Sequence, residues 1–438
     1  MKEENVKQID HVTKSGIHYC YITLVSRGAF CKNCHTFTKK VHGYKEKPIT
    51  HSILIKRQMK IIYRQRRYIC TNKECGKTVI ENDPFTSSHK KITKATRDNV
   101  LKLLKDYNQT YSSVAREMNI SPTLVQEIFD EHLQIRRKEL QEVICVDEFY
   151  LGGHHKNKYA CMLIGFKNGL ILDVLPSRHK SHLRSYFRTI PIEERNKVRY
   201  VSMDMYDTYR EIAHIYLKNA VCCTDSFHLA KNVNEVLNNI RCKVMNRYRK
   251  DKKSDEYYLL KYKNKLLFLD GSKIEDEKYR FNHHYRCDYT DGALLEKILS
   301  IDSQLKEAYD LKELFMIFNR STEDRESLSS MLEALINEFK LSSIDGYRTF
   351  GYTLESWKEE TLNSFITYDG RRISNGPIEG RNKYIKVMLE LSNGISNFKR
   401  FRNRILYVFN KHEVPSDTVL DTRLLKLPGT IRGKYNKE

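Results

Sequence analysis

Two acidic residues follow apolar runs that have the composition of buried strands. Asp147 follows residues 143–146 and Asp204 follows residues 198–203. A carboxylate buried at the end of such a strand costs several kcal/mol unless a cation or hydrogen-bond donors satisfy it. If the two strands are neighbours, both carboxylates meet at one edge of the sheet and favour a divalent ion between them. Oxygen ligands of this kind select Mg²⁺ or Mn²⁺.

A third acid, Glu379, stands at the start of a predicted basic helix, where Ser374 or Asn375 can cap the first turn. The helix dipole favours a negative charge there, so Glu379 could simply complement the dipole. At helical spacing it shares one side with an amide and two cations, Asn382, Lys383 and Lys386. That side of the helix also suits a metal ligand beside a phosphodiester backbone.

Four cysteines have the spacing of a zinc site. Cys31 and Cys34 form C-x-x-C, and Cys70 and Cys75 form a second pair with four residues between them. Two such pairs can bring four thiolates to a tetrahedral ion, which suits structural Zn²⁺ because no coordination position stays open. The alternative is a set of ordinary reduced thiols. Further residues could replace one ligand: Cys20, His35, His42 and His51.

The elements that must position these groups can be read from periodicity. Residues 17–80 read as a small β-rich module in which residues 52–71 form a pair of strands. From residue 143 the order is three strands, helix, strand, helix, strand, which indicates an α/β domain whose first three strands can form a meander. Residues 227–365 read as mostly helical, and we treat most of them as an insertion.

Between the two β-containing regions, residues 93–132 have helical periodicity and predict three helices. The last two flank a short turn through Asn119, and Ser121 with Pro122 supplies the cap and first turn of the final helix. This spacing is that of a helix-turn-helix whose second helix enters the DNA major groove, although a hairpin in a protein core also matches it. Thr123 and Gln126 would then face DNA, and Arg136 and Arg137 would follow phosphates.

Charge and hydropathy define the class of partner. The chain has 77 Lys and Arg against 55 Asp and Glu, and its net charge of +22 is spread over its whole length. This charge indicates a polyanionic partner such as DNA. The alternative is a soluble protein whose surface is basic without such a partner. The sequence contains no apolar run of membrane-spanning length, and its start is too polar for a signal peptide. We expect a cytoplasmic, nucleoid-associated protein.

Several blocks resemble one family in content and in order. They are "VICVDEFYLG", "GLILDVLPSRHKSHL", "VRYVSMDMYDTYR", "CCTDSFHLAKNVNEVLN" and "SNGPIEGRNKYIK" followed by "SNGISNFKRFRNRILY". They resemble the bacterial insertion-sequence transposases of the ISL-three family, and "CKNC" with "RYICTNKECGKTVIE" resembles the zinc module of the same family. The resemblance extends over residues 28–408 and implies an RNase H-like catalytic domain with an Asp, Asp, Glu triad.

The resemblance assigns the triad to Asp147, Asp204 and Glu379, with Glu148 as the main rival for the first position. We prefer Asp147 and expect Glu148 to point to the other face of the strand. The family block that contains Asp225 and His228 implies accessory roles near the metal ions or DNA. Two metal ions held by the triad would support an in-line displacement at phosphorus, for both strand cleavage and strand joining.

The expected function is therefore a transposase that binds the terminal inverted repeats of an insertion sequence. Partners would be double-stranded DNA, at the repeats and at the target, and further copies of the chain, with no membrane. Phosphate contacts would come from basic residues of the last two predicted helices: Lys383, Lys386, Arg400 and Arg402. Two alternatives are a zinc and helix-turn-helix regulator with a decayed catalytic domain, and a nuclease of the RNase H superfamily.

The fold class that follows is α/β, an RNase H-like domain with a helical insertion, after a small zinc-binding β module and a helix-turn-helix domain. The expected boundaries are residues 1–90 for the zinc module and 91–140 for the helix-turn-helix domain. The catalytic domain would cover residues 141–410, with the insertion at about 240–360, and residues 411–438 would form a basic C-terminal tail.

Overall fold

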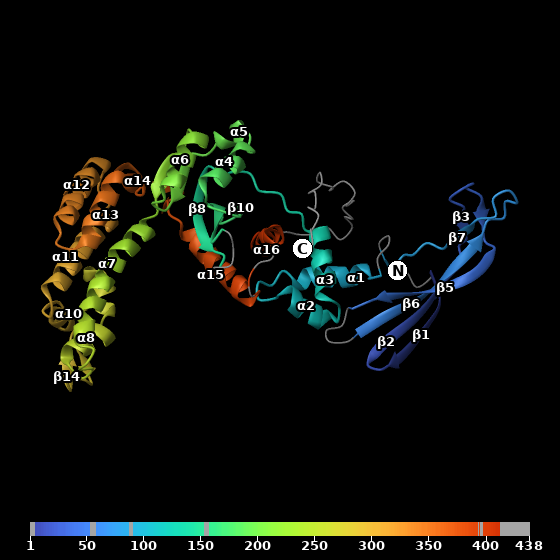
Figure 1. Ribbon diagram of the computed structural model, residues 1–438, viewed down its shortest axis with the longest axis horizontal. Coiled ribbons are helices and arrows are strands. Elements are labelled where there is room, and N and C mark those ends of the chain that lie inside the picture. Colours follow the sequence, from blue (N-terminus) through green and yellow to red (C-terminus); the bar gives the residue numbers. More distant parts are fainter. Residues whose placement is uncertain are drawn as a thin grey trace, which may run out of the picture. The chain divides into compact units, whose positions relative to one another are not determined.

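The computed structural model describes residues 5–52, 58–86, 91–152, 157–392, 394 and 397–411. It forms two compact units (Figure 1), one of Met1–Arg137 with Asn382–Glu438 and one of Lys138–Arg381. The expected C-terminal tail lies outside the described residues, except residue 411. None of the helices in the described ranges is long and apolar enough to cross a membrane.

The N-terminal module is a five-stranded sheet with the order β1-β2-β6-β5, and β7 pairs with β6. Its strands are β1 (Val6–Lys14), β2 (Ile17–Leu24), β5 (Val41–Thr50), β6 (Gln58–Ile69) and β7 (Thr78–Ile80). Alternating residues of β2 and β6 pack on Ile49 to form the core of the sheet. The pair of strands expected in residues 52–71 is therefore one long strand from residue 58, and residues 53–57 lie outside the described part.

Three helices follow: α1 (Lys94–Leu103), α2 (Tyr111–Met118) and α3 (Pro122–His132). Each is started by a side-chain cap from a hydroxyl group, and Asn119 turns the chain between α2 and α3 with a left-handed φ of 53°. The C-terminal helix α16 (Phe398–Phe409) packs on this group, because Tyr407 Oη donates to Leu101 O at 2.7 Å and Asn403 Nδ2 donates to Leu133 O at 2.7 Å. This helix, expected with the catalytic domain, thus packs with the helices that precede that domain.

The second unit is built on a five-stranded sheet with the order β10-β9-β8-β11-β12. Its strands are β8 (Val143–Tyr150), β9 (Tyr159–Gly165), β10 (Ile171–Leu175), β11 (Tyr200–Met203) and β12 (Val221–Thr224). The first three form the predicted antiparallel meander, and β11 and β12 lie parallel to β8. Crossover helices make the parallel pairing possible: α4 (Lys180–Arg188) with the short α5 (Ile192–Arg195), and α6 (Asp207–Tyr216).

Helices α4 and α6 cover one face of this sheet (Figure 1). Apolar side chains of α4, such as Leu183 and Phe187, and of α6, such as Ile212, pack on Val146 and Leu163. The opposite face receives the chain segment that leads into α15 (Gly376–Leu391), since Cys145 Sγ donates to Ser374 O at 3.4 Å. Strands β8, β11 and β12 run in the same direction, so the carboxyl ends of β11 and β12 lie at one edge of the sheet, beside the later residues of β8.

The predicted helical insertion is present and has its own core. It starts inside α7 (Ser226–Arg247) and continues through α8 (Asp255–Tyr262), α9 (Lys265–Phe268), α10 (Asp291–Leu299), α11 (Ser303–Arg320), α12 (Arg325–Leu341), α13 (Asp345–Ser356) and α14 (Lys358–Asn363). A hairpin of β13 (Arg280–Asn282) and β14 (Cys287–Tyr289) projects between α9 and α10. A second hairpin, β15 (Thr367–Tyr368) and β16 (Arg371–Arg372), returns the chain to the sheet.

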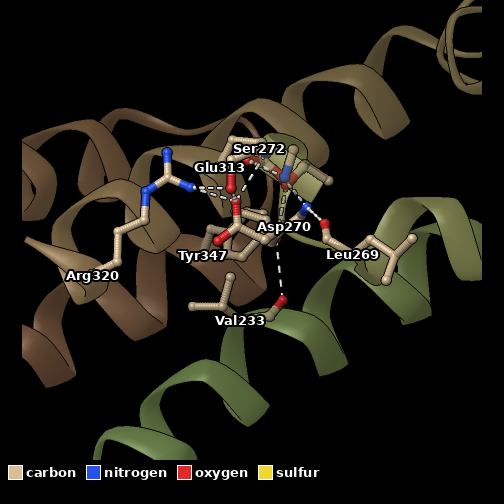
Figure 2. Close-up of polar contacts among 10 residues, drawn as sticks. Val233, Leu269, Asp270, Ser272, Glu313, Arg320 and Tyr347 are labelled. Atoms are coloured by element: carbon tan, nitrogen blue, oxygen red, sulfur yellow. Dashed lines mark hydrogen bonds and ion pairs between the residues drawn. The ribbon is translucent and has the colours of Figure 1, made fainter. Parts of the chain in front are cut away.

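A buried cation ties the insertion together. Lys312 of α11 is 1% exposed, donates to Leu269 O at 2.7 Å and forms an ion pair with Glu313. Figure 2 shows this region, where Glu313 also accepts from the backbone of Gly271, and Tyr347 Oη donates to Val233 O at 3.2 Å. These contacts fix the loop after α9 onto α11.

Replacing Lys312 with Met should lower the free energy of unfolding by about 2–4 kcal/mol, because the Leu269 carbonyl and the Glu313 carboxylate both lose a buried donor. Urea titration followed by circular dichroism measures this loss. Lys306→Met is the matched control, since Lys306 is an exposed lysine of the same helix. Equal urea midpoints for the two variants would contradict the structural role.

Candidate active site

Three aspartates lie at the same level of three neighbouring parallel strands. In the register of β8, β11 and β12, Tyr200 pairs with Val143 on one side and with Val221 on the other. Four residues later come Asp147, Asp204 and Asp225. The ladder continues to this level, because Asp225 N donates to Met203 O at 2.8 Å. Strand register therefore aligns these three acids at the carboxyl edge of the sheet.

The closest group of acids in the described part of the chain contains Asp147, Glu148 and Asp204. One carboxylate oxygen from each lies within 4.8 Å of the others. Glu148 is bound by side chains on the α4 and α6 side of the sheet, where Tyr209 Oη donates to it at 3.0 Å and Arg178 forms an ion pair with it. The long side chain of Glu148 nevertheless reaches the site, so Glu148 and Asp147 both belong to the group of three acids.

The electrostatics of this group favour a bound cation. Burial, with repulsion from neighbouring acids, raises the pKa of Asp204 to about 7 and the pKa of Asp147 to about 6. Asp204 Oδ1 is buried and has no hydrogen-bond partner among the described residues. An unsatisfied carboxylate oxygen beside two further carboxylates is a suitable donor set for Mg²⁺ or Mn²⁺. The residues present therefore fit a divalent ion.

Glu379 lies in the first turn of α15, as expected, but outside this closest group. Burial and the charge of Asp225 raise the pKa of its carboxyl, while His228 and Lys231 oppose that rise. Asp225 is 1% exposed and also acts electrostatically on Asp147. Asp225 thus connects Glu379 electrostatically to the acids at the strand ends.

The accessory pair sits at the start of α7. Asp225 caps this helix by accepting from Phe227 N, and His228 Nδ1 lies 3.9 Å from Asp225 Oδ2. Asp225 Oδ2 is buried and has no hydrogen-bond partner in the described ranges. A capping role explains Oδ1, whereas Oδ2 is left for a ligand.

Asn375 joins the elements that carry the acids. Its backbone N donates to Asp225 Oδ1 at 3.2 Å, and its side-chain Nδ2 donates to Val146 O at 3.1 Å. Its carbonyl accepts from Ile378 N at 2.8 Å and from Glu379 N at 3.3 Å. Asn375 thus stands directly before α15, but its buried side chain does not cap the helix: Oδ1 has no partner among the described residues, and Nδ2 links the start of α15 to β8. Sequence periodicity carries no signal for this contact.

Asn375→Ala should weaken Mn²⁺ binding about tenfold, because Glu379 and Asp147 lose the link that fixes their spacing. Isothermal titration with Mn²⁺ measures the change. Asn363→Ala is the matched control: Asn363 Nδ2 also donates to a strand carbonyl, that of Cys222, at 2.9 Å. Both variants should lose stability, and equal Mn²⁺ affinity in both would show that Asn375 is merely structural.

Comparison with known proteins identifies the family. A family model of DDE transposases of the ISL-three type, described as "Transposase", matches residues 144–405, more than half of the chain. The chain belongs to this transposase family. It is also similar to the transposase for insertion sequence element IS1001 of Bordetella parapertussis, with 20% identity over 398 residues, which cover 89% of this chain and 91% of that protein.

The transposase brings its four predicted cysteine ligands together in the N-terminal unit. The Sγ atoms of Cys31 and Cys75 lie 3.7 Å apart, and those of Cys34 and Cys70 lie 3.4 Å apart. A tetrahedral ion with Zn–S bonds near 2.3 Å requires sulfur separations of about 3.8 Å. Each pair closes a turn that positions its thiols, since Cys31 N donates to Thr36 O and Cys70 N donates to Lys77 O, both at 2.9 Å.

The chemistry of the four thiols also fits a metal ion. Hydrogen bonds from the side chain and backbone of Thr36 lower the pKa of Cys34 to about 6, whereas burial and the neighbouring thiols raise that of Cys70 to about 12. Four adjacent thiols cannot all ionise without a cation to offset their charges. Apart from cysteines, the buried residues of this cluster in the described part of the chain are Tyr68 and Val79. The module around the cysteines therefore has little other core. Among the described residues, the cluster contains none of the four alternative ligands considered: Cys20, His35, His42 and His51.

The residues expected to contact DNA have different surroundings. Thr123 is exposed at the start of α3, and Arg136 is exposed after its end, whereas Arg137 is half-buried. Lys383 and Lys386 are exposed on α15. Their exposure is compatible with contacts to phosphates and bases, and these contacts stay predictions.

Three further expected contacts already have partners inside the transposase. Arg400 forms an ion pair with Asp130 at 2.6 Å and donates to Gln126 Oε1 at 3.0 Å. Arg402 donates to Ile135 O at 2.8 Å. These bonds hold α16 against α3, so any contact of Gln126, Arg400 or Arg402 with DNA must compete with a structural role.

Proposed function

We propose that this transposase binds the terminal inverted repeats of an insertion sequence and catalyses metal-dependent cleavage and transfer of DNA strands. The observation that carries the proposal is the convergence of Asp147 and Glu148 of β8 with Asp204, which follows β11, together with a buried unsatisfied oxygen on Asp204. The sheet order, with a meander followed by two parallel strands, supports an RNase H-like catalytic domain.

The proposed catalytic residues are Asp147, Asp204 and Glu379, with Asp225 and His228 in accessory positions. They would hold Mg²⁺ or Mn²⁺, and such ions supply the Lewis acidity that activates a water or DNA 3′-hydroxyl and stabilises the leaving oxygen. Asp147 and Asp204 bind from the sheet, while Glu379 approaches from an exposed helix start where a DNA strand has access. Glu148 is held at the same site by Arg178 and Tyr209.

The DNA ends would be bound by the N-terminal unit. The four-cysteine site would hold structural Zn²⁺ and fix two turns of the β module, and α3 of the proposed helix-turn-helix would enter the major groove with Thr123 exposed. Basic side chains such as Lys383 and Lys386 would add phosphate contacts whose strength falls with salt. We further propose that two or more copies assemble on DNA, because an element has two ends.

A cleavage assay on duplex DNA that carries the ends of the element tests the proposal. We expect nicking with Mg²⁺ or Mn²⁺, none with EDTA, and none on duplexes with scrambled ends. Specific binding without metal-dependent cleavage would favour the decayed regulator. Cleavage of RNA:DNA hybrids in preference to the ends would favour a nuclease of the RNase H superfamily.

A further inference from the structure

A pocket of about 390 Å³ lies in the N-terminal unit, apart from the acids of the sheet. The start of α2, the middle of α3 and the start of α16 line it. Its polar lining residues include Thr110, Tyr111, Arg116, Gln126, Arg400 and Arg404. Three of these are arginines, and none of the described residues that line the pocket is a carboxylate, so the pocket favours negative charge.

The main evidence for an anionic ligand is the buried side chain of Arg404. Its side chain is 4% exposed, and its Nη2 donates to the carbonyls of Asp106 at 2.8 Å and Gln109 at 3.1 Å. Its Nε and Nη1 are buried and have no hydrogen-bond partner within the described residues. Burial lowers the pKa of Arg404 to about 10, and the charges of Tyr111, Tyr407 and Asp106 oppose this only in part. A buried guanidinium with two unsatisfied N–H groups calls for an acceptor.

Tyr111 provides another donor at the same place. Its hydroxyl is buried and has no partner among the described residues, and the guanidinium groups of Arg400 and Arg404 lie 5.9 and 5.8 Å from its ring centroid. The acids that act on this region do not fill the pocket: Asp130 is bound to Arg400, and the side chain of Asp106 is exposed. Unsatisfied donors on two neighbouring side chains match an oxyanion with several acceptor oxygens.

Two helix starts add to the same charge preference. Thr110 caps α2 and Asn397 caps α16, and both capping residues line the pocket. Backbone N–H groups at a helix start carry partial positive charge, which favours an anion. Together with the buried arginine, they distinguish this pocket from a surface patch of basic residues.

We infer that this pocket binds a phosphate group through Arg404 and Tyr111. The ligand is a backbone phosphodiester of DNA or a free phosphate. Gln126 of α3 lines the pocket, so a DNA phosphate beside the groove that α3 enters is the favoured source. The DNA source rests on the proposed function, whereas the phosphate site itself does not.

Thermal unfolding of the full chain tests the phosphate site. Sodium phosphate, added at constant ionic strength to the Mg²⁺-free protein, should raise the melting temperature of the wild type. Tyr111→Phe, which removes only an unpaired hydroxyl, and Arg404→Met should lose most of this rise. Tyr407→Phe is the matched control, because it removes a tyrosine hydroxyl that bonds to Leu101 O outside the pocket; it should lower stability but keep the rise.

Binding of a duplex with the element's end separates the two phosphate sources. If DNA supplies the phosphate, Tyr111→Phe and Arg404→Met should each weaken DNA binding about tenfold. Arg404→Met should also reduce the slope of log K against log salt by about one. Loss of the phosphate-dependent rise with unchanged DNA binding assigns the site to a free phosphate. A wild type that binds phosphate but not the ends keeps the site and refutes the proposed end binding. An equal rise in wild type, Tyr111→Phe and Arg404→Met overturns the inference.

Discussion

Replacing Asp204 with Asn should abolish metal-dependent strand cleavage, by about a thousandfold or more, and leave binding of the element's ends intact. Asp204 belongs to the closest group of acids and carries the buried oxygen without a partner. The neutral amide removes one charge from the ion-binding group at almost constant volume. Because the proposed function assigns end binding to the N-terminal unit, filter binding and cleavage of the same duplex should respond differently.

The same variant should be more stable than the wild type when no metal is present. Burial raises the pKa of Asp204 to about 7, so the folded state binds more protons than the unfolded state between about pH 4 and 7. The wild type therefore loses stability as the pH rises through this window, and Asp204→Asn lacks the part of this loss that comes from Asp204, although the part from Asp147 remains. Melting temperatures should differ by several degrees at pH 7.5 and converge near pH 4, and Mg²⁺ should stabilise only the wild type.

Asp207→Asn supplies the control, because Asp207 is an exposed acid at the start of α6. Its cleavage rate, Mg²⁺ response and melting temperature should match those of the wild type. Normal cleavage by Asp204→Asn would remove this residue from the metal site. A fall in its metal-free melting temperature would contradict the repulsion argued from its burial.

Removing the metal from the four-cysteine site should release about one zinc ion per chain and weaken end binding at least tenfold. The thiols of Cys31, Cys34, Cys70 and Cys75 share a small core of their own, separate from the core of the sheet. Chelation should therefore loosen the two cysteine turns and leave the strands in place. Zinc release can be followed with a colorimetric chelator, and the loosened turns by limited proteolysis.

Cys34→Ser should reproduce the effect of chelation, because the hydroxyl replaces the thiolate with a poor zinc ligand. Cys287→Ser is the control, since Cys287 is an exposed thiol of the hairpin in the insertion. Purified protein without zinc that still binds the ends normally would refute the metal site. Zinc retained in Cys34→Ser with full end binding would assign the ion to other ligands.

The local elements follow from the sequence because their signals are local. Apolar runs locate the strands β8 to β12, and hydroxyl caps with Pro122 locate the starts of α2 and α3. The C-x-x-C pattern and its second pair indicate the four thiols that lie together. In each case a few neighbouring residues determine the backbone or the ligand set.

The arrangement of the acids is different, because it depends on pairings between distant parts of the chain. Strand register aligns Asp147, Asp204 and Asp225 across separations of 57 and 21 residues. The sequence suggested the first two only on the condition that their strands are neighbours, and Asp225 only through a family pattern. The reach of Glu148 into the site depends on Arg178 and Tyr209 of other elements.

The sequence by itself located the acid that follows β11, grouped the four cysteines and showed the excess of positive charge, but β8 continues past Asp147 to Tyr150 instead of ending before it. Only the tertiary structure decided that Asn375 links α15 to β8 and that α16 packs on α1 to α3, with Arg404 buried in a pocket. The physical reason is that side-chain partners for buried polar groups are chosen by long-range packing. Periodicity and capping, in contrast, are set by residues within a few positions of each other.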